Sequence, residues 1–169
     1  MTADYLAQTP FAALSLIAAP AILTNASSVL ALSTSNRFLR AGERMRAVAS
    51  ELQKLSPGDE HTLLLVQAGR IERQALLLLT ALRGAYVALG SFAAASLISI
   101  VGAGLAPTSF RLASQIAVGL ALVVGFGGVA GIVSACTHLF RATRLSLLNI
   151  SEEATLIRRR ETARASAAR

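Results

Sequence analysis

The chain has 169 residues, of which 54% are hydrophobic, with a mean hydropathy of +0.59 and a formal net charge of +7. This apolar content exceeds that of an ordinary water-soluble core, so it indicates a single-domain integral membrane protein. The single Cys136 excludes an intrachain disulfide, and no Cys/His spacing suggests a metal or cofactor site. Since long apolar segments accompany the positive charge, we expect anionic lipid rather than nucleic acid as its partner.

The first apolar segment, 11–32, has about the 20 residues that a helix needs to cross a bilayer. The ten residues before it contain Asp4 and no lysine or arginine, whereas a cleavable signal peptide begins with positive charge. We therefore predict an uncleaved transmembrane helix, loosened or kinked at Pro20.

Polar residues gather in the second half of this span. Helical spacing aligns Asn25, Ser28 and Ser35 along one stripe, with Thr24 beside it. An amide that faces lipid without a partner is costly, so the stripe is expected to face protein or water. Two interpretations stay open: bonds to neighbouring helices, or the lining of a pore at the axis of a homo-oligomer.

Residues 36–83 are predicted to form a cytoplasmic helical hairpin with its turn at 56–59. Apolar residues recur at alternating steps of three and four on both sides of the turn, which is typical of an antiparallel coiled coil. The first seam contains Phe38, Ala41, Met45, Val48, Leu52 and Leu55; the second contains Leu64, Ala68, Ile71, Ala75, Leu78 and Leu82.

Two further spans are predicted at 84–105 and 116–139. Small residues recur every four positions in 84–105, and Gly127 and Gly131 form a G-x-x-x-G in 116–139. Both helices are therefore expected to pack closely. A ligand site made by exposed backbone at these glycines is the alternative. The chain is predicted to end with a cytoplasmic helix at 140–160 and a frayed tail at 161–169. The apolar seam of this helix runs through Phe140, Leu147, Ile150, Ala154 and Ile157.

Charge predicts the topology. Of the 16 lysines and arginines, only Arg111 lies between the second and third spans, and the others lie in 37–83 and 141–169. By the positive-inside rule these two regions are cytoplasmic, which places the N-terminus outside and the C-terminus inside. We expect a multi-pass protein of a bacterial cytoplasmic membrane.

No Asp, Glu, Lys or Arg lies within the three predicted spans, and no catalytic motif is present, so we expect neither an ion-coupled transporter nor an enzyme. A basic belt is predicted at the inner leaflet. Its arginines either extend to headgroups and pair with nearby glutamates, or form a site for anionic lipid or phosphate. The belt comprises Asn36, Arg37, Arg40, Arg44, Arg46, Arg83, Arg141 and Arg144.

The run 32–40, LSTSNRFLR, followed by Arg44-Met45-Arg46, resembles a family of small bacterial inner-membrane proteins catalogued only as a domain of unknown function. That family shares an L-S-x-x-N-R-x-x-R pattern with R-x-R after it. The resemblance implies three spans with a helical cytoplasmic part, and it draws attention to the arginines of the motif. It implies no activity.

The sequence as a whole predicts an all-α integral membrane protein with three transmembrane helices, extended into a cytoplasmic antiparallel coiled-coil hairpin and a C-terminal helix. The preferred functional hypothesis is a homo-oligomer with a channel-like, passive permeation role, in which Thr24, Asn25 and Ser28 line the path. The rival hypothesis is a non-conducting scaffold whose basic stalk binds anionic lipid or a partner coiled coil.

Overall fold

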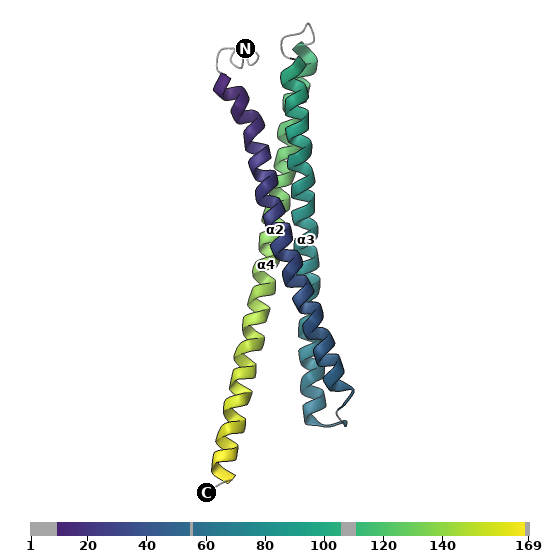
Figure 1. Ribbon diagram of the computed structural model, residues 1–169, viewed down its shortest axis with the longest axis vertical. Helices are drawn as coiled ribbons and strands as arrows, with labels where there is room; N and C mark the ends of the chain where they lie inside the picture. Colours follow the sequence, from purple (N-terminus) through teal and green to yellow (C-terminus); the bar gives the residue numbers. More distant parts are fainter. Residues whose placement is uncertain (1–9, 55, 106–110, 168–169) are drawn as a thin grey trace. The chain divides into compact units, whose positions relative to one another are not determined.

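The computed structural model describes residues 10–167 apart from residue 55 and 106–110, and the side chains of 18–148 apart from 55, 59–60 and 106–111. It contains three α-helices, α2 (Pro10–Leu52), α3 (Asp59–Leu105) and α4 (Arg111–Ala167), and the described residues contain no strand (Figure 1). The all-α prediction is confirmed.

The helix ends agree with the predicted turns, with one exception. The carbonyl of Gly58 accepts hydrogen bonds from the backbone N–H and the hydroxyl of Thr62, both at 3.1 Å, and this fixes the start of α3. Pro20 lies inside an unbroken α2, where its carbonyl accepts the Thr24 hydroxyl at 2.8 Å. The exception is α4, which continues to Ala167 through most of the tail that was expected to fray.

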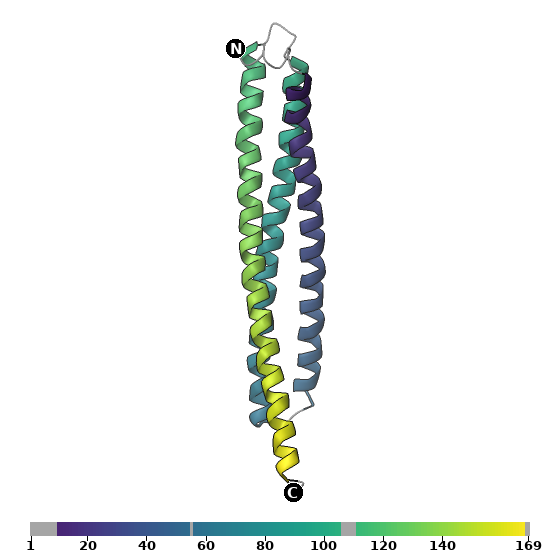
Figure 2. The ribbon, with the colours of Figure 1, turned by 90° about the vertical axis from the view of Figure 1, so that its left-hand side faces the viewer.

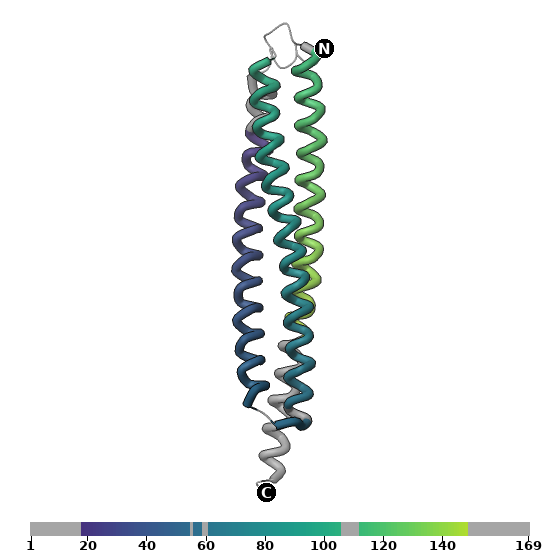
Figure 3. The backbone as a smooth tube through the Cα atoms, turned by 90° about the vertical axis from the view of Figure 1, so that its right-hand side faces the viewer, coloured from purple at the N-terminus to yellow at the C-terminus, as the bar shows by residue number. Residues whose placement is uncertain are grey.

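The chain divides into two compact units, Met1–Thr34 with Ala81–Cys136 and Ser35–Thr80 with Thr137–Arg169. Every helix contributes a segment to each unit. We call them the apolar unit and the basic unit. The course of each helix can be followed in two further views (Figures 2 and 3).

Small side chains bring the helices of the apolar unit together. Ala31, Ala85 and Ala135 form a buried cluster with one residue from each helix. The hydroxyl of Ser114 in α4 donates to the carbonyl of Gly102 in α3 at 3.2 Å. With alanine, serine and glycine at the contacts, backbones approach closely, which is the packing favoured between helices in lipid.

The basic unit has larger side chains in its core. Ala41 of α2, Leu78 of α3 and Ala142 of α4 form its buried cluster, with Phe38 and Leu139 packed against it. The other described residues of the two predicted hairpin seams are buried or half-buried as well. The third seam was wrong where its side chains are described, because Phe140 and Leu147 are 71% and 63% exposed. Its remaining members, Ile150, Ala154 and Ile157, lie outside the described side chains.

Buried residues recur every seven positions along all three helices. This spacing matches 3.5 residues per turn, at which two helices keep the same faces together when they wind round each other left-handedly. It runs through the apolar segments as well as the charged ones. The series are Ser27, Thr34, Ala41 and Val48 in α2; Ile71, Leu78, Ala85, Phe92 and Ser99 in α3; and Ser114, Ala121, Gly128, Ala135 and Ala142 in α4.

Large apolar side chains point outward instead. Leu97, Val123 and Phe126 are 64%, 69% and 72% exposed, and most exposed positions of the apolar segments carry similar residues. Among the described residues, two helices are long and apolar enough to cross a membrane, His61–Leu105 and Leu112–Leu148. The predicted first span, 11–32, is not one of them, and the side chains of its residues 11–17 lie outside the described part.

Candidate functional site

The predicted polar stripe lies on the outer face of α2. Asn25 and Ser28 are exposed, and Thr24 and Ser35 are half-buried. The hydroxyl of Ser28 donates to the carbonyl of Thr24 at 3.0 Å, one turn back in the same helix. Hydroxyls of serine and threonine commonly bond the fourth residue before them in this way, so these groups need no neighbouring helix. The described bonds of the Thr24 and Ser28 hydroxyls thus lie within α2, and bonding to a neighbouring helix and lining of a pore both stay predictions for the stripe.

The buried polar residues of α2 are different ones. Ser27 and Thr34 are fully buried, and each hydroxyl donates to the carbonyl four residues earlier, at 2.8 and 2.7 Å. Because the hydroxyls are satisfied within their own helix, these side chains contribute mainly a small volume at the helix contact. The seven-residue spacing between Ser27 and Thr34 is the signal that would have identified them.

The predicted basic belt divides between the two units. Arg83 belongs to the apolar unit, whereas Asn36, Arg46 and the remaining arginines belong to the basic unit. All of them have exposed side chains. We call the five arginines that lie within about two helical turns of Arg37 along α2 or of Thr143 along α4 the arginine cluster. It consists of Arg37, Arg40, Arg44, Arg141 and Arg144.

A hydrogen bond sets the register of the arginine cluster. The Nη1 of Arg37 in α2 donates to the Oγ1 of Thr143 in α4 at 3.3 Å. Ala41 and Ala142 share the adjacent buried cluster, so the two helices are held at this level by packing as well. Arg37 therefore lies within one helical turn of Arg141 and Arg144.

Positive charge is poorly compensated around this contact. Segments 36–46 and 137–148 contain six arginines and one acidic residue, Glu43. Among the described side chains, none of the six guanidinium groups forms an ion pair. Guanidinium groups bind carboxylate and phosphate through paired hydrogen bonds, so clustered arginines without acidic partners are suited to an anion.

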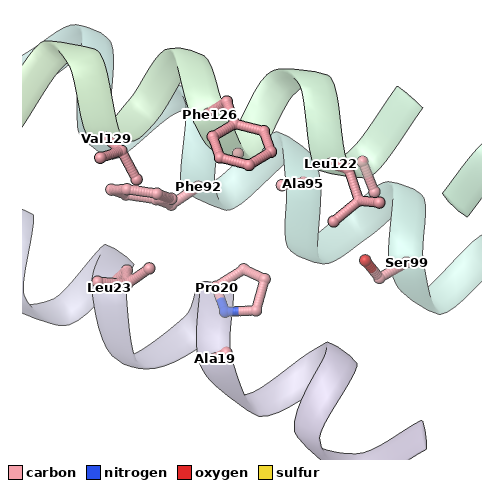
Figure 4. Close-up of a pocket in the computed structure, with 11 residues that line it drawn as sticks. Ala19, Pro20, Leu23, Phe92, Ala95, Ser99, Leu122, Phe126 and Val129 are labelled. Carbon is pink, nitrogen blue, oxygen red and sulfur yellow. The ribbon is translucent and has the colours of Figure 1, made fainter. Parts of the chain in front are cut away.

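A second site is a pocket in the apolar unit, with a volume of about 170 Å³. All three helices line it, with Leu23 and Pro20 from α2 on one side and Phe92 of α3 on another (Figure 4). The rest of the lining is Ala19, Ala95, Ser99, Ala121, Leu122, Gly125, Phe126 and Val129.

The pocket contains one polar side chain, Ser99 of α3. Ser99 is 2% exposed, and its Oγ is buried without a hydrogen-bond partner among the described residues. In Figure 4 the hydroxyl oxygen points into the space between Leu122 and Pro20. In the sequence, Ser99 is only one of the small residues that recur every four positions in the segment 84–105.

Glycine packing differs from the prediction in one position. Gly131 lies at the contact of α3 and α4, where a Cβ would be 2.9 Å from the carbonyl oxygen of Gly84. A Cβ at Gly127 would meet nothing within 4 Å, so Gly127 is not a packing glycine within the chain. Its neighbour Gly128 takes that role, since a Cβ there would be 2.7 Å from the ring of Phe92. Gly128 belongs to the seven-residue series of α4, and Gly127 does not.

Comparison with known proteins agrees with the resemblance found in the sequence. No curated protein and no solved structure matches the chain. The model of one family, described as "Protein of unknown function (DUF2721)", matches residues 17–151, which include the LSTSNRFLR run, the pocket and the arginine cluster. Since this match extends over most of the 169 residues, the chain belongs to the DUF2721 family of proteins of unknown function.

Proposed function

We propose that this protein is a membrane organiser that spans the bilayer three times and binds anionic lipid headgroups through its arginine cluster. The supporting observation is the hydrogen bond of Arg37 to Thr143, which brings the basic segments of α2 and α4 to one level. Like charges at close range repel one another, and a phosphate group between them removes this repulsion. Headgroups at the inner leaflet offer such phosphates.

The proposed membrane position follows from the outward apolar side chains and from charge. The helices α3 and α4 contain segments that are long and apolar enough to cross a bilayer. Segment 11–32 of α2 would be the third span, with the N-terminus outside and the basic unit in the cytoplasm. In a bacterial cytoplasmic membrane, this orientation brings the arginine cluster to the leaflet that its charge requires.

Lipid retention tests the proposal directly. The protein is placed in nanodiscs of mixed phosphatidylglycerol and phosphatidylcholine, and the lipids that stay bound are identified by native mass spectrometry. Each arginine near the surface contributes about 1 kcal/mol, so removing two should weaken phosphatidylglycerol binding about 30-fold. The test variant is Arg40→Gln with Arg144→Gln, since neither side chain makes a described contact.

Arg73→Gln is the matched control, because Arg73 is an exposed arginine of the basic unit that lies on α3, outside the arginine cluster. It should leave phosphatidylglycerol retention unchanged. Raised salt should weaken retention in the unaltered protein, since it screens exposed charges. Equal retention in the double variant, the control and the unaltered protein would show that the cluster is not a headgroup site.

The second candidate function is passive permeation through a homo-oligomer. Asn25 favours it, because its amide is exposed on α2 within a predicted span and needs water or another copy of the chain as its partner. A ring of copies around a central axis would place Thr24, Asn25 and Ser28 along a polar path. Three helices alone do not enclose such a path, so the candidate requires an oligomer.

Native mass spectrometry of the purified protein decides between the candidates. A closed ring of four or more copies supports the pore, and Asn25→Leu should then lower ion flux in reconstituted vesicles. Its matched control is Ala26→Leu, which adds a similar side chain at the next exposed position. A monomer or dimer, or unchanged assembly and flux in Asn25→Leu, rules the pore out.

A further inference from the structure

The hydroxyls of Ser96 and Ser99 in α3 are buried without a partner among the described residues, and of these two only Ser99 lines the pocket of the apolar unit. Four described hydroxyl side chains of α2 bond the carbonyl four residues before them, at 2.7 to 3.0 Å. Ser99 could do the same with Ala95, yet its Oγ has no partner within the described residues and points into the pocket. A buried hydroxyl without a partner is costly, so Ser99 is best explained by a group that enters the pocket.

The volume and the lining of the pocket limit the kind of molecule that can carry the group bonded to Ser99. The pocket has about 170 Å³, and an engineered apolar cavity of about 150 Å³ in another protein stays dry and takes up benzene. Water is disfavoured because it needs two to four polar partners, whereas the lining offers one hydroxyl. The site therefore suits an apolar body of about one ring with one polar atom.

The residues that line the pocket favour a ligand that contains a ring. Phe92 is 1% exposed and packs against Gly128, Phe126 is 72% exposed, and Pro20 contributes its own ring from α2. Figure 4 shows these three rings around one space, with the Ser99 hydroxyl at one side. Aromatic rings pack well against one another in offset or edge-to-face arrangements.

The hydrogen-bonding capacity of Ser99 favours a carbonyl as the polar group of the ligand. A carbonyl oxygen is satisfied by the single O–H that Ser99 can donate, and it carries no donor that would remain unpaired in an apolar pocket. We propose that the pocket binds a lipid-soluble compound with one ring and a carbonyl group, and that Ser99 donates to that carbonyl. The ligand enters from the hydrocarbon interior, so this inference shares the proposed membrane position but not the headgroup site.

A pair of probes with the same number of heavy atoms tests the inference. Acetophenone has the ring and the carbonyl, and isopropylbenzene has the ring with a methyl group in place of the oxygen. The protein carries labelled leucine and valine methyl groups in nanodiscs, and each probe is titrated with its concentration expressed per lipid. NMR shifts of the methyl groups of Leu23, Leu122 and Val129 report binding in the pocket.

Acetophenone is expected to bind about fivefold more tightly than isopropylbenzene, since one buried hydrogen bond contributes about that factor. Ser99→Ala should make the two affinities equal and leave the methyl spectrum of the free protein dispersed. Gly125→Leu should abolish binding of both probes, because it adds a side chain to the lining. Gly119→Leu is its control, since Gly119 is an exposed glycine of α4 outside the pocket.

Three results would overturn the inference: no methyl shift with either probe, equal affinities in the unaltered protein, or a carbonyl preference that survives Ser99→Ala. The outcome is independent of the arginine cluster. The Arg40→Gln, Arg144→Gln variant should bind acetophenone as the unaltered protein does. A loss of headgroup binding at the arginine cluster and an absence of probe binding in the pocket can thus be told apart.

Discussion

Gly84 of α3 and Gly131 of α4 face each other so closely that a Cβ on either residue would lie 2.9 Å from the carbonyl oxygen of the other. The relationship is reciprocal, and in both cases the nearest atom belongs to the backbone. Backbone atoms cannot turn aside as a flexible side chain can. This pair therefore sets the distance between α3 and α4 in the apolar unit.

Gly84→Ala and Gly131→Ala are each expected to destabilise the protein by about 1–3 kcal/mol, because the added methyl group forces the helices apart. Thermal unfolding in mild detergent measures the change. Gly90→Ala and Gly127→Ala are the controls on the same helices, where a Cβ meets nothing within 4 Å. They should be neutral or stabilising by about 0.5–1 kcal/mol, as expected for glycine to alanine in a helix. Equal effects at all four positions would contradict this account.

Gly128→Ala is expected to cost less stability than Gly131→Ala, although its Cβ would come as close as 2.7 Å to Phe92. The ring of Phe92 borders the pocket and can move into it, whereas the backbone opposite Gly131 has no such space. The same movement should reduce the pocket volume and weaken acetophenone binding. Thermal unfolding and the methyl titration, made on one preparation, measure both effects. A larger loss of stability than in Gly131→Ala would show that the ring is fixed.

Ser27 and Ser28 are neighbours in α2 with opposite surroundings, one fully buried and one exposed. Ser27→Leu is expected to destabilise by about 1–3 kcal/mol through overpacking, and Ser28→Leu by much less. Ser27→Ala should cost less than about 1 kcal/mol, because the hydroxyl bonds only its own helix, at the Leu23 carbonyl. Unfolding of the three variants, followed by circular dichroism, tests the order. A large loss in Ser27→Ala would instead assign the hydroxyl a role between helices.

Cysteine labelling tests the membrane position of α4 and the side of the turn before α3. In a Cys136→Ala background, Val123→Cys and Gly58→Cys are treated with a charged, membrane-impermeant maleimide. Val123 is 69% exposed in the isolated chain, so protection of a cysteine there requires the bilayer, which excludes both the reagent and the thiolate. The cysteine at position 58 should react only when the cytoplasmic face is accessible. Rapid labelling at position 123 in intact membranes would contradict insertion.

Much of the fold could be predicted because each helix has a strong local signal. Long apolar runs and the proline and glycine near residue 57 indicated three long helices and a turn before Asp59. The inward residues of α2 and α3 in the basic unit were identified because large apolar side chains alternate there with charges. Along α4 the same reasoning selected Phe140 instead of Ala142, since it looked for the larger residue.

The candidate sites were harder to predict, because in the apolar unit size, not polarity, distinguishes the buried face from the exposed one. Asn25 and Ser28 attracted notice as polar residues, yet they lie outside, whereas Ser27 is at the helix contact. The pocket combines residues of three helices, and no local pattern links Pro20 with Ser99. The arginines of the cluster were recognised from their spacing, but the contact of Arg37 with Thr143 depends on tertiary register.

The seven-residue recurrence of buried positions also determines which changes of length the chain tolerates. A duplication or deletion of seven residues within one helix returns every later side chain to its original direction, since seven residues make two turns of a 3.5-residue period. A change of a single residue rotates the remainder of that helix by about 100°. A single deletion in α4 before Gly128 would replace Gly128, Ala135 and Ala142 at the contacts with the bulkier Val129, Cys136 and Thr143. Length variants that keep the fold should therefore differ by whole heptads.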